Sequence, residues 1–89
     1  MVVYFVTALQ NSTHAIDLAV LREFPTSSYK VEPGKWFVSA QAATGKELSI
    51  LLGIRETQSH LILPVRGYNG RAQPDLWEWL SAETAKASA

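Results

Sequence analysis

The chain has 89 residues, no cysteine and a formal net charge of zero, with eight basic and eight acidic residues. This length suits a single domain, and the lack of thiols excludes disulfides, thiolate metal sites and cysteine nucleophiles. The balanced charge argues against a protein that grips nucleic acid through overall positive charge, although it allows a local basic patch. Hydrophobic residues make up 47% of the chain and charged residues 18%, which is typical of a globular protein.

The opening segment, residues 2–9, predicts a central β-strand because it is rich in β-branched and aromatic residues. Both of its alternating faces are apolar, and such strands are covered on both sides. The segment is too short to span a bilayer and lacks the basic start of a signal peptide, so we expect a cytoplasmic protein without membrane contact. One face carries Val3, Phe5 and Leu9, and the other carries Val2, Tyr4, Val6 and Ala8.

The next segment predicts an amphipathic helix that ends at Pro25. Three consecutive residues at its start have side chains that can cap a helix, and its apolar residues recur at helical spacing. The capping residues are Asn11, Ser12 and Thr13, and the apolar stripe is Ile16, Val20, Leu21 and Phe24.

A β-hairpin is predicted after the helix. Residues 32–35 fit a type II turn, since Pro33 presets φ at the second position and Gly34 supplies the positive φ at the third. The turn joins a short strand over residues 28–31 to an apolar strand over residues 35–40. We expect the short strand at an edge of the sheet and the apolar strand in its centre.

A second helix and a fourth strand follow the hairpin. Thr44 and Glu47 match a capping box, and Gly53 is a residue that ends helices. The fourth strand is predicted over residues 60–66. Because proline cannot donate to the strand ladder, Pro64 places this strand at an edge.

The chain closes with a turn at residues 67–70 and a third helix from Pro74 to about Lys86. The first six elements follow the β-α-β-β-α-β order of the ferredoxin-like plan, an α+β fold. We therefore predict a ferredoxin-like domain over residues 1–81, with an antiparallel sheet in strand order 4-1-3-2 and an added C-terminal helix. Residues 82–89 are predicted to form a frayed tail.

The second face of this sheet predicts an interface. In the ferredoxin-like plan both main helices cover one face, yet the first strand is apolar on both faces. Either the C-terminal helix covers the second face or a second copy of the chain does, and large apolar patches usually mark interfaces. We predict a homodimer through the second face or through the Pro64 edge. The residues expected there are Tyr4, Val6, Pro64, Trp77 and Trp79.

Two histidines are predicted near one end of the sheet. His14 and His60 could approach each other close to Asp17 and Glu56, where they could bind a metal or perform acid–base catalysis. They lack the spacing of a metal-binding motif, and solvated or capping histidines explain them as well. We therefore predict no metal, no cofactor and no catalytic residue.

The opposite end carries a candidate site for nucleic acid or phosphate. The turn after the fourth strand offers open backbone amides, an aromatic face and two guanidinium groups. A plain turn with solvated arginines is the simpler alternative. Gly45-Lys46 at the same end belongs to the helix cap, because the other residues of a phosphate loop are missing. The candidate residues are Arg66, Tyr68, Asn69 and Arg71.

The segment Trp36-Phe37-Val38-Ser39 followed by Thr44-x-x-Glu47-Leu48 resembles the small ferredoxin-like bacterial proteins grouped around the second CRISPR-associated core protein. The likeness covers roughly the whole chain in the order of its elements. It implies a homodimer and, in the CRISPR members, a nucleic-acid scaffold or a metal-dependent nuclease. The catalytic relatives carry an aspartate at the end of the first strand, where this chain has Thr7-Ala8-Leu9-Gln10. Without that carboxylate a metal is not held at the dimer axis, so no site residue is carried over.

These observations predict a non-catalytic homodimer that binds a protein partner or nucleic acid. Two alternatives stay open. One is a metal-dependent nuclease or small hydrolase that uses His14 and His60, and the other is a small-molecule sensor with a pocket between subunits.

Overall fold

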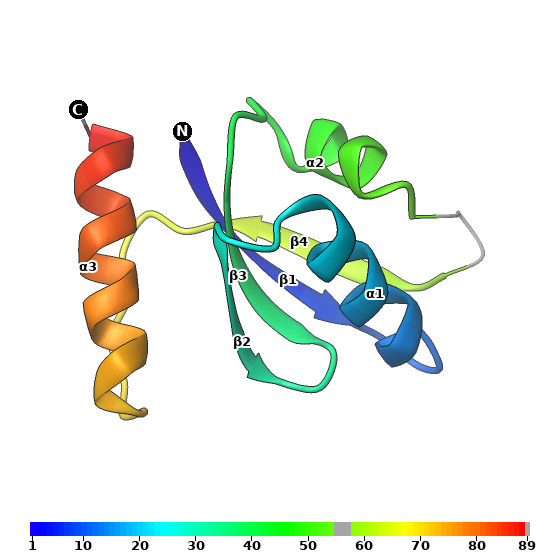
Figure 1. Ribbon diagram of the computed structural model, residues 1–89, viewed down its shortest axis with the longest axis horizontal. Coiled ribbons are helices and arrows are strands. Elements are labelled where there is room, and N and C mark those ends of the chain that lie inside the picture. Colours follow the sequence, from blue (N-terminus) through cyan, green and yellow to red (C-terminus); the bar gives the residue numbers. More distant parts are fainter. Residues whose placement is uncertain (55–57, 89) are drawn as a thin grey trace.

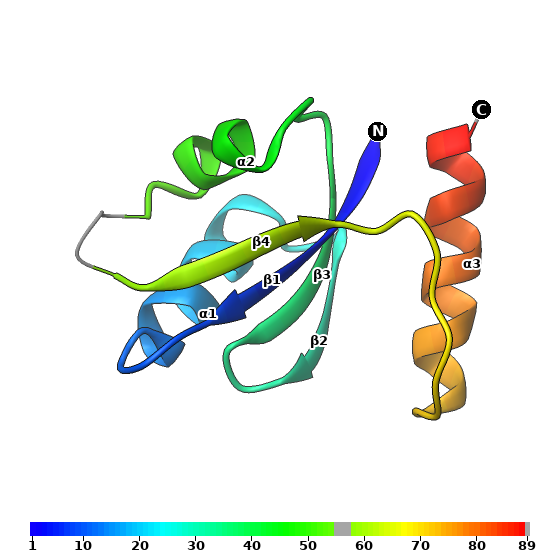
Figure 2. The ribbon, with the colours of Figure 1, turned by 180° about the vertical axis from the view of Figure 1, so that it is seen from behind.

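The computed structural model describes residues 1–54 and 58–88, which form a four-stranded sheet and three helices (Figure 1). In chain order the elements are β1 (Val2–Ala8), α1 (Thr13–Glu23), β2 (Ser28–Glu32), β3 (Lys35–Ala40), α2 (Gly45–Leu52), β4 (His60–Pro64) and α3 (Pro74–Ser88). Helices α1 and α2 lie on one side of the sheet, and α3 stands across one end of it (Figures 1 and 2). Within the described residues, no helix combines the length and the apolar character that a membrane span requires.

The sheet is antiparallel throughout and has the order β2-β3-β1-β4. This is the predicted order 4-1-3-2 read from the opposite edge, with β1 and β3 in the centre. β3 pairs with β1 from Val2↔Ala40 to Thr7↔Lys35, and β4 pairs with the other side of β1. Because directly paired residues point to the same side of a sheet, this register assigns each strand residue to one of two faces.

The main core lies between the sheet and the two helices α1 and α2. Tyr4 and Val6 point into it, with 1% and 0% of their surfaces exposed. They are inaccessible unless the core opens, so the prediction that they lie at an interface is corrected. The other alternation set of β1 faces away from these helices. The buried members of the core are Tyr4, Val6, Ile16, Ala19, Val20, Trp36, Val38, Ala40, Ala42, Leu48 and Leu52.

Local sequence signals fix the ends of α2 as predicted. The Thr44 side chain accepts a hydrogen bond from the Glu47 N–H at 3.2 Å. The Glu47 carboxylate reaches back to the N–H of Ala43 at 2.9 Å, one residue before the N-cap. Gly53 ends the helix with φ of 66°, a left-handed conformation that favours glycine.

A polar link fastens the hairpin to α1. The Asp17 Oδ1 atom accepts hydrogen bonds from the Gly34 N–H at 2.9 Å and from the Trp36 Nε1–H at 2.7 Å. Gly34 has the positive φ, 81°, that the turn requires. Lys30 Nζ lies 3.9 Å from the second carboxylate oxygen of Asp17. Asp17, a candidate neighbour of the two histidines, is thus engaged in holding the hairpin.

Several element ends differ from those predicted: β1 ends at Ala8 instead of residue 9, and β2 continues to Glu32. β4 ends at Pro64 instead of Arg66, and α3 continues to Ser88 through part of the segment predicted to be frayed. The buried stripe of α3 extends to Glu83, whose carboxylate lies 3.2 Å from Lys86 Nζ.

Candidate functional site

The second face of the sheet is covered by α3 at one end. Val3 of β1 packs there against Leu76 and Leu80 of α3. A row of four aromatic rings extends this small core across the strands, with neighbouring centroids 5.1, 6.4 and 6.1 Å apart. The row runs through Phe5, Phe37, Trp79 and Tyr29.

The first turn of α3 is tied to the edge strand β2. Burial of the ring, followed by a hydrogen bond to the Asp75 carboxylate, raises the pKa of Tyr29. Trp77 and Trp79, predicted at an interface, are half-buried against their own chain in this arrangement. The C-terminal helix therefore covers part of the second face, which was the alternative to its cover by a second copy of the chain.

The other half of this face is not covered by a helix (Figure 2). Phe5 pairs with Leu63 and Thr7 pairs with Leu61, so both leucines of β4 share the face of Phe5. Leu61 is 44% exposed, Leu63 is 47% exposed and Phe5 is half-buried. We call Phe5, Leu61 and Leu63 the open strip. Apolar side chains gathered on an uncovered sheet face are a feature of binding surfaces.

The edges of the sheet are less suited to pairing with another chain. β4 forms one edge of the sheet. Just after it, the Val65 N–H donates a 2.8 Å hydrogen bond to the Val3 carbonyl, which shows that Val65 and every second residue before it bond to β1. The backbone groups of Ile62 and Pro64 therefore point outward, where Pro64 has no N–H to donate. The Ile62 carbonyl lies beneath Gly45 of α2, only 3.5 Å from where a Cβ would stand. At the other edge, β2 has five residues and an irregular register.

The segment between β4 and α3 carries the predicted nucleic-acid residues. This linker, residues 65–73, runs alongside α3 in both ribbon views (Figures 1 and 2). Tyr68 stacks on Trp77, with ring centroids 5.7 Å apart and ring planes 11° apart, yet Tyr68 is 44% exposed. Trp77 covers one face of the Tyr68 ring, and the other face of the ring stays accessible. Arg66, Asn69 and Arg71 are exposed along the same segment.

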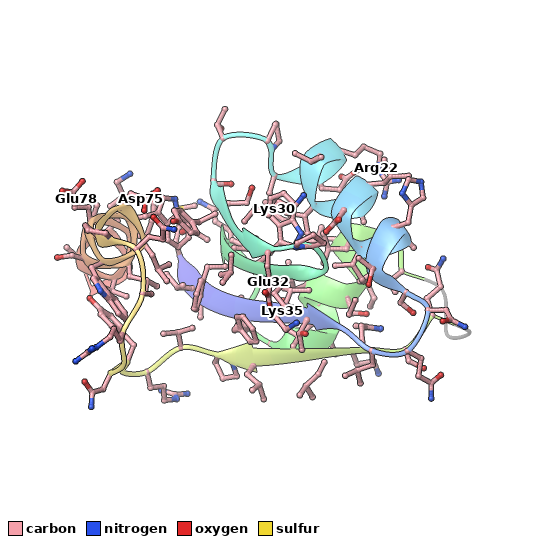
Figure 3. All side chains as sticks on the ribbon, turned by 90° about the horizontal axis from the view of Figure 1, so that it is seen from below. Arg22, Lys30, Glu32, Lys35, Asp75 and Glu78 are labelled. Atoms are coloured by element: carbon pink, nitrogen blue, oxygen red, sulfur yellow. The ribbon has the colours of Figure 1, made fainter. Side chains whose placement is uncertain are left out.

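Ion pairs form mainly away from the linker. Lys30, Glu32 and Lys35 lie on the hairpin of β2 and β3 (Figure 3). Among the described residues, no ion pair includes Lys46, Arg66 or Arg71. The ion pairs that do form are Arg22–Glu23, Lys30–Asp17, Lys35–Glu32 and Lys86–Glu83, with N–O distances of 2.8, 3.9, 2.9 and 3.2 Å.

A cavity of about 190 Å³ joins the start of α2 to the end of β4. Thr44 and Gly45 line one side of it and Arg66 lines another, so the predicted meeting of these two segments at one end is confirmed. Tyr4 forms part of the lining, and its O–H donates to the Ala42 carbonyl at 2.6 Å. Burial raises the pKa of Tyr4, and the nearby charge of Arg66 opposes this increase.

At the end of the sheet opposite this cavity, the His60 ring forms two hydrogen bonds. Its Nδ1 lies 2.8 Å from the Gln58 carbonyl and its Nε2 lies 2.9 Å from Ser49 Oγ. A ring that donates from Nδ1 accepts the Ser49 hydroxyl at Nε2. His14 is exposed on α1, and Glu56 lies outside the described residues. In residues 1–54 and 58–88, no three His, Cys, Asp or Glu side chains are placed to hold a metal ion.

The outer side of α1 and α2 also exposes apolar side chains. A groove of about 320 Å³ runs between α1 and the end of α2, with Leu18 and Ile54 in its lining. Arg22 crosses this region and donates from Nη2 to the Leu52 carbonyl at 2.8 Å. Leu18 is 52% exposed, close to the value for Leu63. It therefore offers a matched comparison with the open strip.

Sequence reasoning missed two of these features for different reasons. The Ser49–His60 contact joins residues whose spacing matches no motif, so the sequence held no signal for it. The open strip did leave a signal, because Leu61 and Leu63 alternate with Ile62 and make both faces of β4 apolar.

Comparison of the chain with known protein families gives no matching family model, and comparisons with curated proteins and with solved structures give no significant match.

Proposed function

We propose that the protein is a non-catalytic homodimeric binding or scaffold protein with a ferredoxin-like fold and an added C-terminal helix. The open strip carries this proposal, because Leu61 and Leu63 remain nearly half exposed on a face that α3 covers at its other end. A partner that removes apolar surface of this kind from water lowers the free energy of the system.

A second copy of the chain is the partner that best suits the open strip. In a two-fold dimer one patch meets itself, so an apolar patch needs no complementary charge on a different protein. Phe5 already contacts Phe37 of the small core and pairs with Leu63 of β4. A dimer at this surface would therefore continue the chain's own second core. Small chains bury a limited share of their surface on folding and gain most from such an addition.

The topology and the resemblance both support this assignment. The sheet order β2-β3-β1-β4 with two helices on one face agrees with the ferredoxin-like plan. The chain resembles the proteins grouped around the second CRISPR-associated core protein. This resemblance implies a homodimer that serves as a scaffold on nucleic acid. The end of β1 has no carboxylate, which argues against the catalytic form of that family.

Sedimentation velocity of matched variants tests the proposed interface. The wild-type chain and Leu18→Lys should sediment as dimers, since Leu18 lies on the outer side of α1. The double variant Leu61→Lys/Leu63→Lys should sediment as a folded monomer with an unchanged circular dichroism spectrum, because two charges cannot be buried face to face. Dissociation by Leu18→Lys with a persistent dimer in the double variant would contradict the proposal.

A small hydrolase is a second candidate, and the Ser49–His60 contact favours it. The distance of 2.9 Å is within the reach of a nucleophile and its general base, and the Gln58 carbonyl occupies the position of an orienting group. Neither Ser49 nor His60 lines the cavities of about 190 and 320 Å³, which favours a role in fastening α2 to β4. Hydrolysis of an activated ester that disappears in Ser49→Ala and in His60→Ala would establish the hydrolase. The binding protein should show no turnover above buffer.

A further inference from the structure

We infer that the linker and the adjoining start of α2 bind single-stranded nucleic acid, with a base stacked on Tyr68 and phosphates held by Arg66 and Arg71. The inference rests on the proposed binding function and names the class of its ligand. The ring stack, the distribution of unpaired charge and the shape of the linker each support it.

Tyr68 has the geometry of a stacking platform. Its ring is held 11° from parallel to Trp77 at 5.7 Å, so the protein fixes the orientation of the ring before a ligand binds. With 44% of the residue exposed, the ring can accept a second planar group on its free side. Base stacking on an aromatic ring requires an unstacked base, and single strands supply one where a duplex does not.

The charges near the linker are positive although the net charge of the chain is zero. Arg66 and Arg71 lie in the linker and Lys46 follows Gly45 of the cavity wall, and none of the three is ion-paired among the described residues. Unpaired cations along the linker and beside its first residues form a local anion-binding field.

The acidic groups closest to this region are engaged or turned away. Glu47 accepts the N–H of Ala43, and Asp75 lies beside Tyr29 of β2. Glu78 lies on the side of α3 away from the linker (Figure 3).

The linker is open enough for a strand to lie along it. Residues 66–73 are all exposed, and a Cβ added to Gly67 would meet no atom within 4 Å. Arg66 and Arg71 flank Tyr68, and the chain between them spans at most about 18 Å. This reach suits contact with a few successive nucleotides, so we expect a short, salt-sensitive site.

Fluorescence anisotropy with labelled oligothymidylate, oligouridylate and a duplex, over a salt series, tests the inference. Both single strands should bind more tightly than the duplex, and the tighter of the two identifies DNA or RNA as the ligand. Tyr68→Ala should weaken binding about tenfold or more, whereas Tyr68→Phe keeps the ring and should bind as the wild type does. Each lost phosphate contact should reduce the logarithmic salt slope by about 0.7, so Arg66→Ala/Arg71→Ala should flatten it.

Lys35→Ala is the matched control, because Lys35 is an exposed cation paired with Glu32 at the hairpin. Preference for the duplex, equal losses in Lys35→Ala and in the arginine variant, or full binding by both Tyr68→Ala and the arginine variant would overturn the inference. Absence of binding would also overturn it and would leave a protein as the partner. The linker variants should remain dimeric in sedimentation, so failure of this inference is distinguishable from failure of the proposed dimer.

Discussion

The two faces of the sheet differ in how completely helices cover them, although both are built on the same central strand. Toward α1 and α2, Tyr4 and Val6 are 1% and 0% exposed. On the opposite face, α3 buries Val3 but leaves Leu61 and Leu63 nearly half exposed. The apolar character of a strand therefore does not decide its burial. The covering helices do, and the apolar surface they leave uncovered is available for binding.

The largest expected effect of a substitution lies on the fully covered face. Leu48 is 0% exposed in the main core, so Leu48→Ala should lower the free energy of unfolding by about 2–5 kcal/mol through lost contacts and a cavity. Denaturant unfolding followed by circular dichroism measures the loss. A decrease below about 1 kcal/mol would mean that this face is not the tightly packed one.

The next effect concerns the polar link between α1 and the hairpin. Asp17→Ala removes the acceptor of two hydrogen bonds and leaves the Trp36 N–H buried without it, so we expect a loss of about 2–3 kcal/mol. Glu32→Ala, which removes an exposed ion pair with Lys35, should change stability by at most about 0.5 kcal/mol. Equal losses in the two variants would contradict the assigned role of Asp17.

A smaller effect, with a distinct pH dependence, belongs to Tyr4. Tyr4→Phe leaves the buried Ala42 carbonyl without its donor and should cost about 1–2 kcal/mol near neutral pH. Because burial raises the pKa of Tyr4 above its ordinary value of about 10, the associated stability is present below that pH and is lost as the pH rises through the folded-state value. Unfolding of the phenylalanine variant should therefore depend less steeply on pH in this alkaline range. Identical slopes would refute the assigned environment of Tyr4.

The smallest effect on the folded monomer is expected at the open strip. Leu63 is 47% exposed, so Leu63→Ala should change the stability of the monomer by about 0.5 kcal/mol or less, while it weakens self-association. Unfolding measured at increasing protein concentration separates the two effects. A loss comparable to that of Leu48→Ala, independent of concentration, would mean that Leu63 belongs to the monomer core.

Local signals account for most of what the sequence predicted correctly. The Pro33-Gly34 turn, the Thr44 cap and the Gly53 stop each act within a few residues, and all three are found in the structure. Pro64 predicted an edge strand for the same reason, since its missing N–H has no place in a ladder. Such features depend on backbone geometry that the residue itself dictates.

The division of residues between the two faces was beyond the sequence. Tyr4 and Val6 were predicted at an interface because both alternation sets of β1 are apolar, and alternation cannot tell which set meets the helices. The partial cover by α3 depends on where the linker directs that helix. The contact of Ser49 with His60 likewise arises when α2 packs on β4, and no spacing in the chain encodes it.

Light scattering coupled to size exclusion tests the central claim most directly, because it reports the mass of the unmodified chain in solution. Self-association through the open strip predicts twice the chain mass of 9.8 kDa at micromolar concentration, with dissociation in Leu61→Lys/Leu63→Lys. A wild-type chain that elutes at 9.8 kDa across that range would contradict the claim.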